Sequence, residues 1–102
     1  MPALNYSQPL YNFDNGATSY TAVKDCYLLG SMCGSMLGSA WKGIVSINGT
    51  AVYTLAGSGS TNVASSNSIT IPLTKIKTGD TVSISLTSVP NIYMSLHIFE
   101  EL

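Results

Sequence analysis

The apolar residues of this chain recur at every second position over most of its length. In residues 81–87, TVSISLT, aliphatic side chains alternate with hydroxyl side chains. Residues 68–74, SITIPLT, repeat the pattern and place Ile71 and Leu73 on one face, while Pro72 favours an edge or the end of a strand. A period of two puts neighbouring side chains on opposite faces of a β-strand. The pattern therefore predicts half-buried strands.

Two short segments predict tight turns between such strands. Asn48-Gly49 separates two β-prone runs, and this dipeptide suits the central positions of a type I′ turn, where both residues need a positive φ. The predicted hairpin pairs strands at about residues 44–47 and 50–53. Residues 77–80, KTGD, predict a second tight turn.

Short strands separated by turns at intervals of roughly 8–12 residues are typical of a β-sandwich or jelly roll. A length of 102 residues fits one domain. We therefore predict an all-β fold, an antiparallel jelly-roll β-sandwich, over residues 18–102. Residues 1–17 are expected to form an N-terminal segment that is a candidate edge strand.

The segment YLLGSMCGSMLGSAW, residues 27–41, carries a glycine at every fourth position. None of these glycines precedes Lys and Ser or Thr, so the P-loop pattern is absent. A GxxxG motif that packs membrane helices needs an apolar helix around it, whereas the flanks here are strand-like. The segment therefore predicts a strand from Cys26 to about Met32, followed by a crossing of small residues that lets backbones approach closely.

Charged residues make up 9% of the chain, with four lysines, no arginine and five acidic residues. A nucleic-acid-binding surface needs a basic stripe that this composition cannot supply. A hydrophobic fraction of 45% excludes disorder. No apolar run reaches the roughly 18–20 residues that span a bilayer, and no signal-peptide pattern is present. We expect a protein made in the cytoplasm without a signal peptide, with no membrane span and no nucleic-acid partner.

The two cysteines, Cys26 and Cys33, are not expected to form a disulfide. In an extended strand their spacing corresponds to about 23 Å and to opposite faces of the sheet. A disulfide needs Cα atoms within about 7 Å of each other. Because no CxxC motif accompanies them, buried free thiols are favoured over a metal or redox site.

Few residues in this chain are suited to catalysis. His97 is the single histidine, and it lies within the last apolar strand. No nucleophile elbow surrounds any serine, and the aspartates stand beside Gly, Asn or Lys, where they suit turns. The sequence therefore predicts no enzyme, no catalytic or metal-binding residue and no cofactor.

The C-terminal part of the chain resembles the end of tumour necrosis factor-like and complement-type globular head jelly rolls. The resemblance is carried by Leu73, the Gly79-Asp80 turn, Val82 and the apolar run 92–99. Upstream, TSYTAVKDCYLLGS and IVSINGTAVY are similar to small jelly-roll modules of bacteriophage tail-fibre and receptor-binding proteins.

This resemblance implies a homotrimer that binds a host-surface saccharide or decorates a virion. The function expected is therefore a non-enzymatic phage or prophage structural or receptor-binding module. A bacterial cytokine-like or lectin-like binding domain of the same fold is the alternative.

A saccharide site, if the chain has one, is expected among aromatic and amide side chains on the loops. The candidates are Trp41, Asn62, Asn67 and Asn91, since sugars stack on aromatic rings and bond to amides. The absence of arginine argues against strongly anionic sugars. The alternative for Trp41 is that it is a buried residue of the core.

The last strand, NIYMSLHIF, predicts the assembly surface. Its second face carries Tyr93, His97 and Phe99, whereas the outer face of a monomeric sandwich is usually polar. Aromatic residues are enriched in the cores of interfaces. We therefore predict that these three side chains lie near a threefold axis of a homotrimer.

Overall fold

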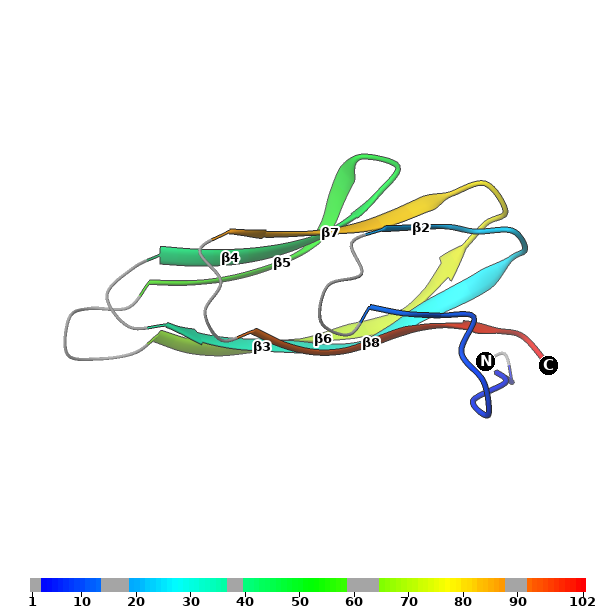
Figure 1. The fold of residues 1–102 in the computed structure, drawn as a ribbon, viewed down its shortest axis with the longest axis horizontal. Coiled ribbons are helices and arrows are strands. Elements are labelled where there is room, and N and C mark those ends of the chain that lie inside the picture. Colours follow the sequence, from blue (N-terminus) through cyan, green and yellow to red (C-terminus); the bar gives the residue numbers. More distant parts are fainter. Residues whose placement is uncertain (1–2, 14–18, 37–39, 59–64, 88–91) are drawn as a thin grey trace.

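The protein is an all-β sandwich in which two four-stranded antiparallel sheets are stacked face to face (Figure 1). The structure is a computed structural model, and it describes residues 3–13, 19–36, 40–58, 65–87 and 92–102. These residues contain no helix. The predicted all-β sandwich is thus confirmed.

The first sheet has the strand order β1-β8-β3-β6 and the second has the order β2-β7-β4-β5. The strands are β1 (Tyr11–Asn12), β2 (Ser19–Thr21), β3 (Cys26–Met36), β4 (Ala40–Ile47), β5 (Thr50–Ser58), β6 (Ser65–Ile76), β7 (Thr81–Thr87) and β8 (Ile92–Glu100). The N-terminal segment contributes β1 at the edge of the first sheet and buries Leu4 and Phe13.

The sandwich has two different ends. We call one of them the loop end: here strands β3, β5 and β7 end and strands β4, β6 and β8 begin. Met36 pairs with Ser65 at this end, and Ala40 pairs with Ser58. The turn end carries the turns after β2, β4 and β6 and both ends of the chain (Figure 1).

The hairpin between β4 and β5 forms as predicted. Ile47 pairs with Thr50 across a two-residue turn, in which Asn48 has a φ of 52° and Gly49 has a φ of 82°. The Asn48 side chain also donates to Asp80 at 2.9 Å and accepts from the Thr81 amide at 2.9 Å. The asparagine therefore connects this turn to the one at residues 77–80.

We expect Gly49→Val to lower the free energy of unfolding by about 1 kcal/mol or more, because a β-branched residue resists positive φ. A Cβ at Gly49 would meet no atom within 4 Å, so the cost is conformational. Urea denaturation measures it. The matched control is Gly49→Asn, which tolerates positive φ and should cost less; equal stability of the valine variant and the wild type would contradict the turn.

Strand β3 is longer than the sequence predicts. It continues through the Gly/Ser segment to Met36, so the prediction that it ends near Met32 is wrong. The strand persists because both neighbours, β6 and β8, pair with it along this segment. Backbones do approach closely at Gly30, where an added Cβ would lie 2.8 Å from the Cα of Leu96, but this glycine lies within the predicted strand and not in the crossing after it. Residues 37–39 of the predicted crossing lie outside the described residues.

Strand β6 forms the edge of the first sheet, as Pro72 predicts. Its pairing with β3 is shifted between Leu28 and Gly30, so two residues of β6 lie opposite one residue of β3. The shift reverses the alternation along β6. Ile71 and Ile76 are buried, whereas Leu73 is only partly buried, so its predicted place on the buried face is wrong.

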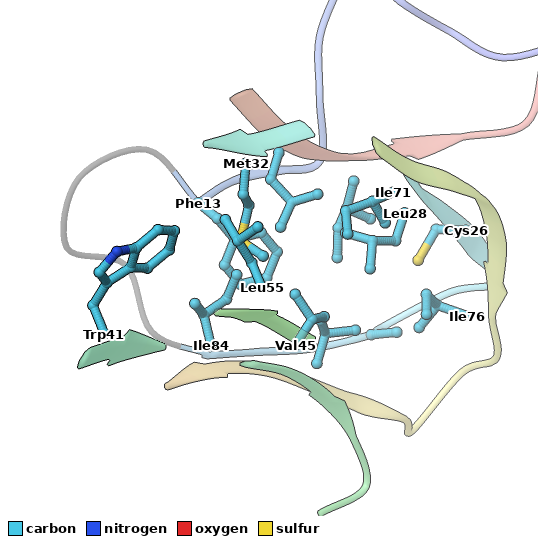
Figure 2. Packing of buried hydrophobic residues seen from close by; sticks show 14 residues of the cluster. Phe13, Cys26, Leu28, Met32, Trp41, Val45, Leu55, Ile71, Ile76 and Ile84 are labelled. Atoms are coloured by element: carbon cyan, nitrogen blue, oxygen red, sulfur yellow. The ribbon is translucent and has the colours of Figure 1, made fainter. Parts of the chain in front are cut away.

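The core lies between the two sheets and is apolar. Figure 2 shows Trp41 at one end of the buried cluster, with Cys26 and Ile76 at the other. No polar or charged side chain of the described residues is buried. Cys26 is a buried free thiol, as expected, but Cys33 is exposed because the odd spacing puts it on the outer face of β3.

Side chains connect the two sheets along both sides of the sandwich. On one side, the rings of Tyr11 and Tyr20 lie 4.8 Å apart, and they join β1 to β2. On the other, Tyr53 and Thr74 share a hydrogen bond of 2.7 Å, and Asn67 donates to the Ala56 carbonyl at 3.0 Å. These contacts join the edge strands β5 and β6.

Carboxylates with lowered pKa values gather at the turn end. Hydrogen bonds from Thr78 lower the pKa of Asp25, and the Asn48 amide lowers that of Asp80. The ammonium group of Lys24, 2.7 Å away, lowers the pKa of Glu100. Each carboxylate thus stabilises the fold in its ionised form.

From neutral pH downward, we expect the stability of the fold to change only in acid. A group with a lowered pKa stabilises the fold above its unfolded pKa, and this contribution is lost as the pH falls through its folded pKa. The melting midpoint should therefore change little between pH 7 and 5 and fall below about pH 4. The Asp80→Asn side chain cannot titrate, so this variant should melt at a lower temperature at pH 7 but show a shallower decline of the melting midpoint in acid. A decline as steep as that of the wild type would show that Asp80 does not contribute to the pH dependence.

Candidate functional site

The outer face of the first sheet combines aromatic and aliphatic side chains. In the β3–β8 ladder, Tyr27 pairs with Phe99 and Leu29 pairs with His97. The inward residues of β3, such as Leu28, are buried in the core, so these four side chains lie on the outer face. We call Tyr6, Tyr27, Leu29, His97 and Phe99 the aromatic face.

The aromatic face is partly covered by the N-terminal segment of the same chain. The ring of Tyr6 contacts Phe99 edge-on at 5.0 Å, and Phe99 is only 9% exposed. His97 lies 5.8 Å from Phe99 and is partly buried. Tyr6 itself remains 62% exposed. The segment therefore extends the aromatic surface outward with its own tyrosine.

Beyond His97, this outer face becomes polar and uncharged. Ser31 pairs with Ser95 on one side and Thr70 on the other, and all three are exposed. The ammonium group of Lys75 lies over the Tyr27 ring at 5.6 Å and marks the border toward β6. Between β3 and β8, the face thus carries no charge among the described side chains.

The outer face of the second sheet has a different character. Its outward side chains are mostly hydroxyls, which include Ser19, Thr21, Ser46, Thr54, Ser83 and Ser85. The exceptions are the exposed Lys42, the partly buried Ile44 and, on β5, Val52, which is 43% exposed. Such a face is well hydrated. The two outer faces of the sandwich are therefore unequal, and the more apolar one is the face on which the sequence places the assembly.

Two of the three predicted interface residues, His97 and Phe99, lie together on the aromatic face. Tyr93 belongs to the same strand, but its side chain lies outside the described part. Sequence reasoning missed Leu29, Tyr27 and Tyr6. The alternation of β3 predicts that Tyr27 and Leu29 share a face, but only the pairing with β8 places that face beside His97.

A hollow of about 270 Å³ lies at the loop end of the second sheet, lined by Ala40, Trp41, Lys42, Ala56 and Gly57. Trp41 pairs with Gly57, and Lys42 pairs with Ala56. Trp41 and Lys42 point to opposite faces of β4. The hollow contacts both because β5 is an edge strand and Gly57 has no side chain to separate the two faces.

The structure brings two of the four predicted saccharide residues to this region. Trp41 is 3% exposed and belongs to the core cluster, as its alternative predicts. Asn67 is exposed, and its amide bonds to Ala56, which lines the hollow. Asn62 and Asn91 lie outside the described residues. Sequence reasoning missed Lys42, whose isolation from other charges becomes visible only in the fold.

The described residues contain no group of three or more His, Cys, Asp or Glu side chains that could hold a metal ion. They also form no helix with the length and hydropathy needed to cross a bilayer. Comparison of the chain with protein-family models finds no match, and comparison with curated proteins finds no significant relative.

Proposed function

We propose that this chain is a non-enzymatic module that assembles into a homotrimer through the aromatic face and serves as a phage structural or receptor-binding domain. Its ligand in this role is a host-surface saccharide. The proposal rests above all on the difference in side-chain character between the two outer faces of the sandwich: the first sheet presents the aromatic face, and the second sheet presents mostly hydroxyls.

The strand order supports a jelly roll as the finer description of the fold. Each pair of consecutive strands, except β4 and β5, is divided between the two sheets. Repeated crossing between two four-stranded sheets is typical of eight-stranded jelly rolls. This is also the fold that the resemblance to tumour necrosis factor-like heads implies.

The aromatic face supports assembly. Tyrosine, phenylalanine and other large apolar residues are enriched in interface cores, and charged residues are depleted there. The side chains of Tyr27, Leu29 and His97 are only partly buried by the chain itself, so an interface can bury them further. A chain of this length also buries only roughly 60–65% of its unfolded surface, so association would add substantial stability.

Size-exclusion chromatography with light scattering tests the assembly. We expect the wild-type protein at micromolar concentration to have a mass near 32 kDa, three times the 10.7 kDa of one chain. The mass should persist on dilution into the low micromolar range because an aromatic interface of standard size is stable there. A mass of one chain would defeat the proposed trimer.

A further inference from the structure

Charge is distributed very unequally between the two ends of the sandwich. Lys42, near the start of β4, is the only charged side chain that the described residues place at the loop end. All other described charged residues lie at or beside the turn end: Lys24, Asp25, Lys75, Lys77, Asp80, Glu100 and Glu101.

The lysines of the turn end have acidic neighbours, whereas Lys42 has none among the described residues. Lys24 pairs with Glu100 at 2.7 Å, and Lys75 lies 3.9 Å from Asp25. The nearest acidic turn contacts Asn48, six residues from Lys42 along β4, which corresponds to about 20 Å of extended strand. This distance is about 2.5 times the Debye length at physiological salt. No acidic side chain of the described residues therefore compensates the positive charge of Lys42 locally.

Lys42 also lines the hollow at this end of the sandwich. The hollow beside it is bounded by the side chains of Ala40, Ala56 and Trp41 and by Gly57, a largely apolar lining. Its volume of about 270 Å³ lies below the 300–1,000 Å³ of common small-molecule pockets. A single small ring fits such a site better than a longer ligand.

We propose that this hollow binds one carboxylate-bearing sugar unit, of the uronic acid or sialic acid class. The Lys42 ammonium donates to the carboxylate, and the C–H face of the sugar ring packs against the apolar lining. One lysine per chain matches one carboxylate, whereas a sulfated polyanion would need the cluster of arginines that this chain lacks.

This inference rests on the proposed saccharide-binding function, and it names the class of sugar and the place. The hollow belongs to β4 and β5 of the second sheet, whereas the aromatic face belongs to the first sheet. Assembly and sugar binding can therefore be tested separately.

The single tryptophan makes the test direct, because Trp41 lines the hollow and gives the only indole signal of the chain. Glucuronate and N-acetylneuraminate are titrated into the full chain, and Trp41 fluorescence and its indole N–H resonance are followed. Glucose and the methyl ester of glucuronate are the uncharged controls. We expect saturable changes with the two acids at millimolar concentration, weakened by added salt, and no saturable change with the neutral sugars.

Three variants distinguish the proposed contacts. Lys42→Gln should weaken binding about threefold to tenfold, as expected for an exposed charge-assisted hydrogen bond. Lys42→Arg keeps the charge and should retain binding. Gly57→Val, a residue suited to a strand, should fill the hollow and abolish the response.

Equal responses to the acidic and neutral sugars, or unchanged binding by Lys42→Gln, would overturn the proposal. No response to either acid by a protein that light scattering shows to be trimeric would overturn the sugar site alone. Binding of the acids by a monomeric protein would leave the site standing and defeat the assembly.

Discussion

Replacing Gly30 by alanine is expected to lower the free energy of unfolding by about 3 kcal/mol or more. Two costs combine at this position. Its φ of 147° is a backbone conformation that residues with a Cβ rarely adopt. An added Cβ would also overlap the carbonyl oxygen of Ser95 and lie 2.8 Å from the Cα of Leu96. Both neighbours are backbone atoms of β8, so they cannot rotate away.

Gly79→Ala is the matched control for this prediction. Gly79 also has a positive φ, 91°, but a Cβ there would meet no atom within 4 Å. Its substitution should cost about 1 kcal/mol, the conformational penalty alone. Urea denaturation of both variants separates the two costs. If Gly30→Ala were no less stable than Gly79→Ala, the close approach of β3 and β8 would be wrong.

Much of the fold could be predicted because its signals are local. Alternation along β7 and the Asn48-Gly49 dipeptide each act within a few residues, and the structure confirms both. The shift in pairing near Gly30 could not be predicted in this way. It arises where β3 meets β6, two strands separated by two others in the chain, and no pattern within either strand fixes their register. The errors about Leu73 and the end of β3 both come from such pairing.

The candidate site was less predictable for the same reason. Alternation placed His97 and Phe99 on one face of β8, but the contact between Phe99 and Tyr6 joins residues 93 positions apart in the chain. Likewise, Lys42 is one of four lysines in the sequence. Its isolation becomes apparent only when the turns gather every other described charge at the opposite end. Surfaces of this kind depend on tertiary neighbours and not on local pattern.

The aromatic face predicts a second large effect, on the oligomeric state. We expect Leu29→Lys to convert the proposed trimer into a monomer with the 10.7 kDa mass of one chain. Leu29 pairs with His97 at the centre of the proposed interface, and Tyr27, Ser31, Ser95 and Phe99 flank this pair in the ladder, so the substitution would bury three ammonium groups with no carboxylate directly beside them. Burying an unpaired charge costs several kcal/mol per ion. Phe99→Lys is less informative, because Phe99 already packs against Tyr6 within the chain and its loss would also detach the N-terminal segment.

The control for this prediction adds the same charge to the other outer face. Thr54 is exposed on β5, and Thr54→Lys should leave the trimer intact, since the hydroxyl face of the second sheet stays hydrated in the proposed assembly. Because Leu29 is only partly buried in the single chain, the Leu29→Lys monomer should remain folded, with the far-ultraviolet spectrum of a β-protein. Light scattering at several concentrations gives the masses of both variants. A Leu29→Lys protein that remains trimeric would exclude the aromatic face as the interface, and loss of the trimer in Thr54→Lys alone would assign assembly to the second sheet.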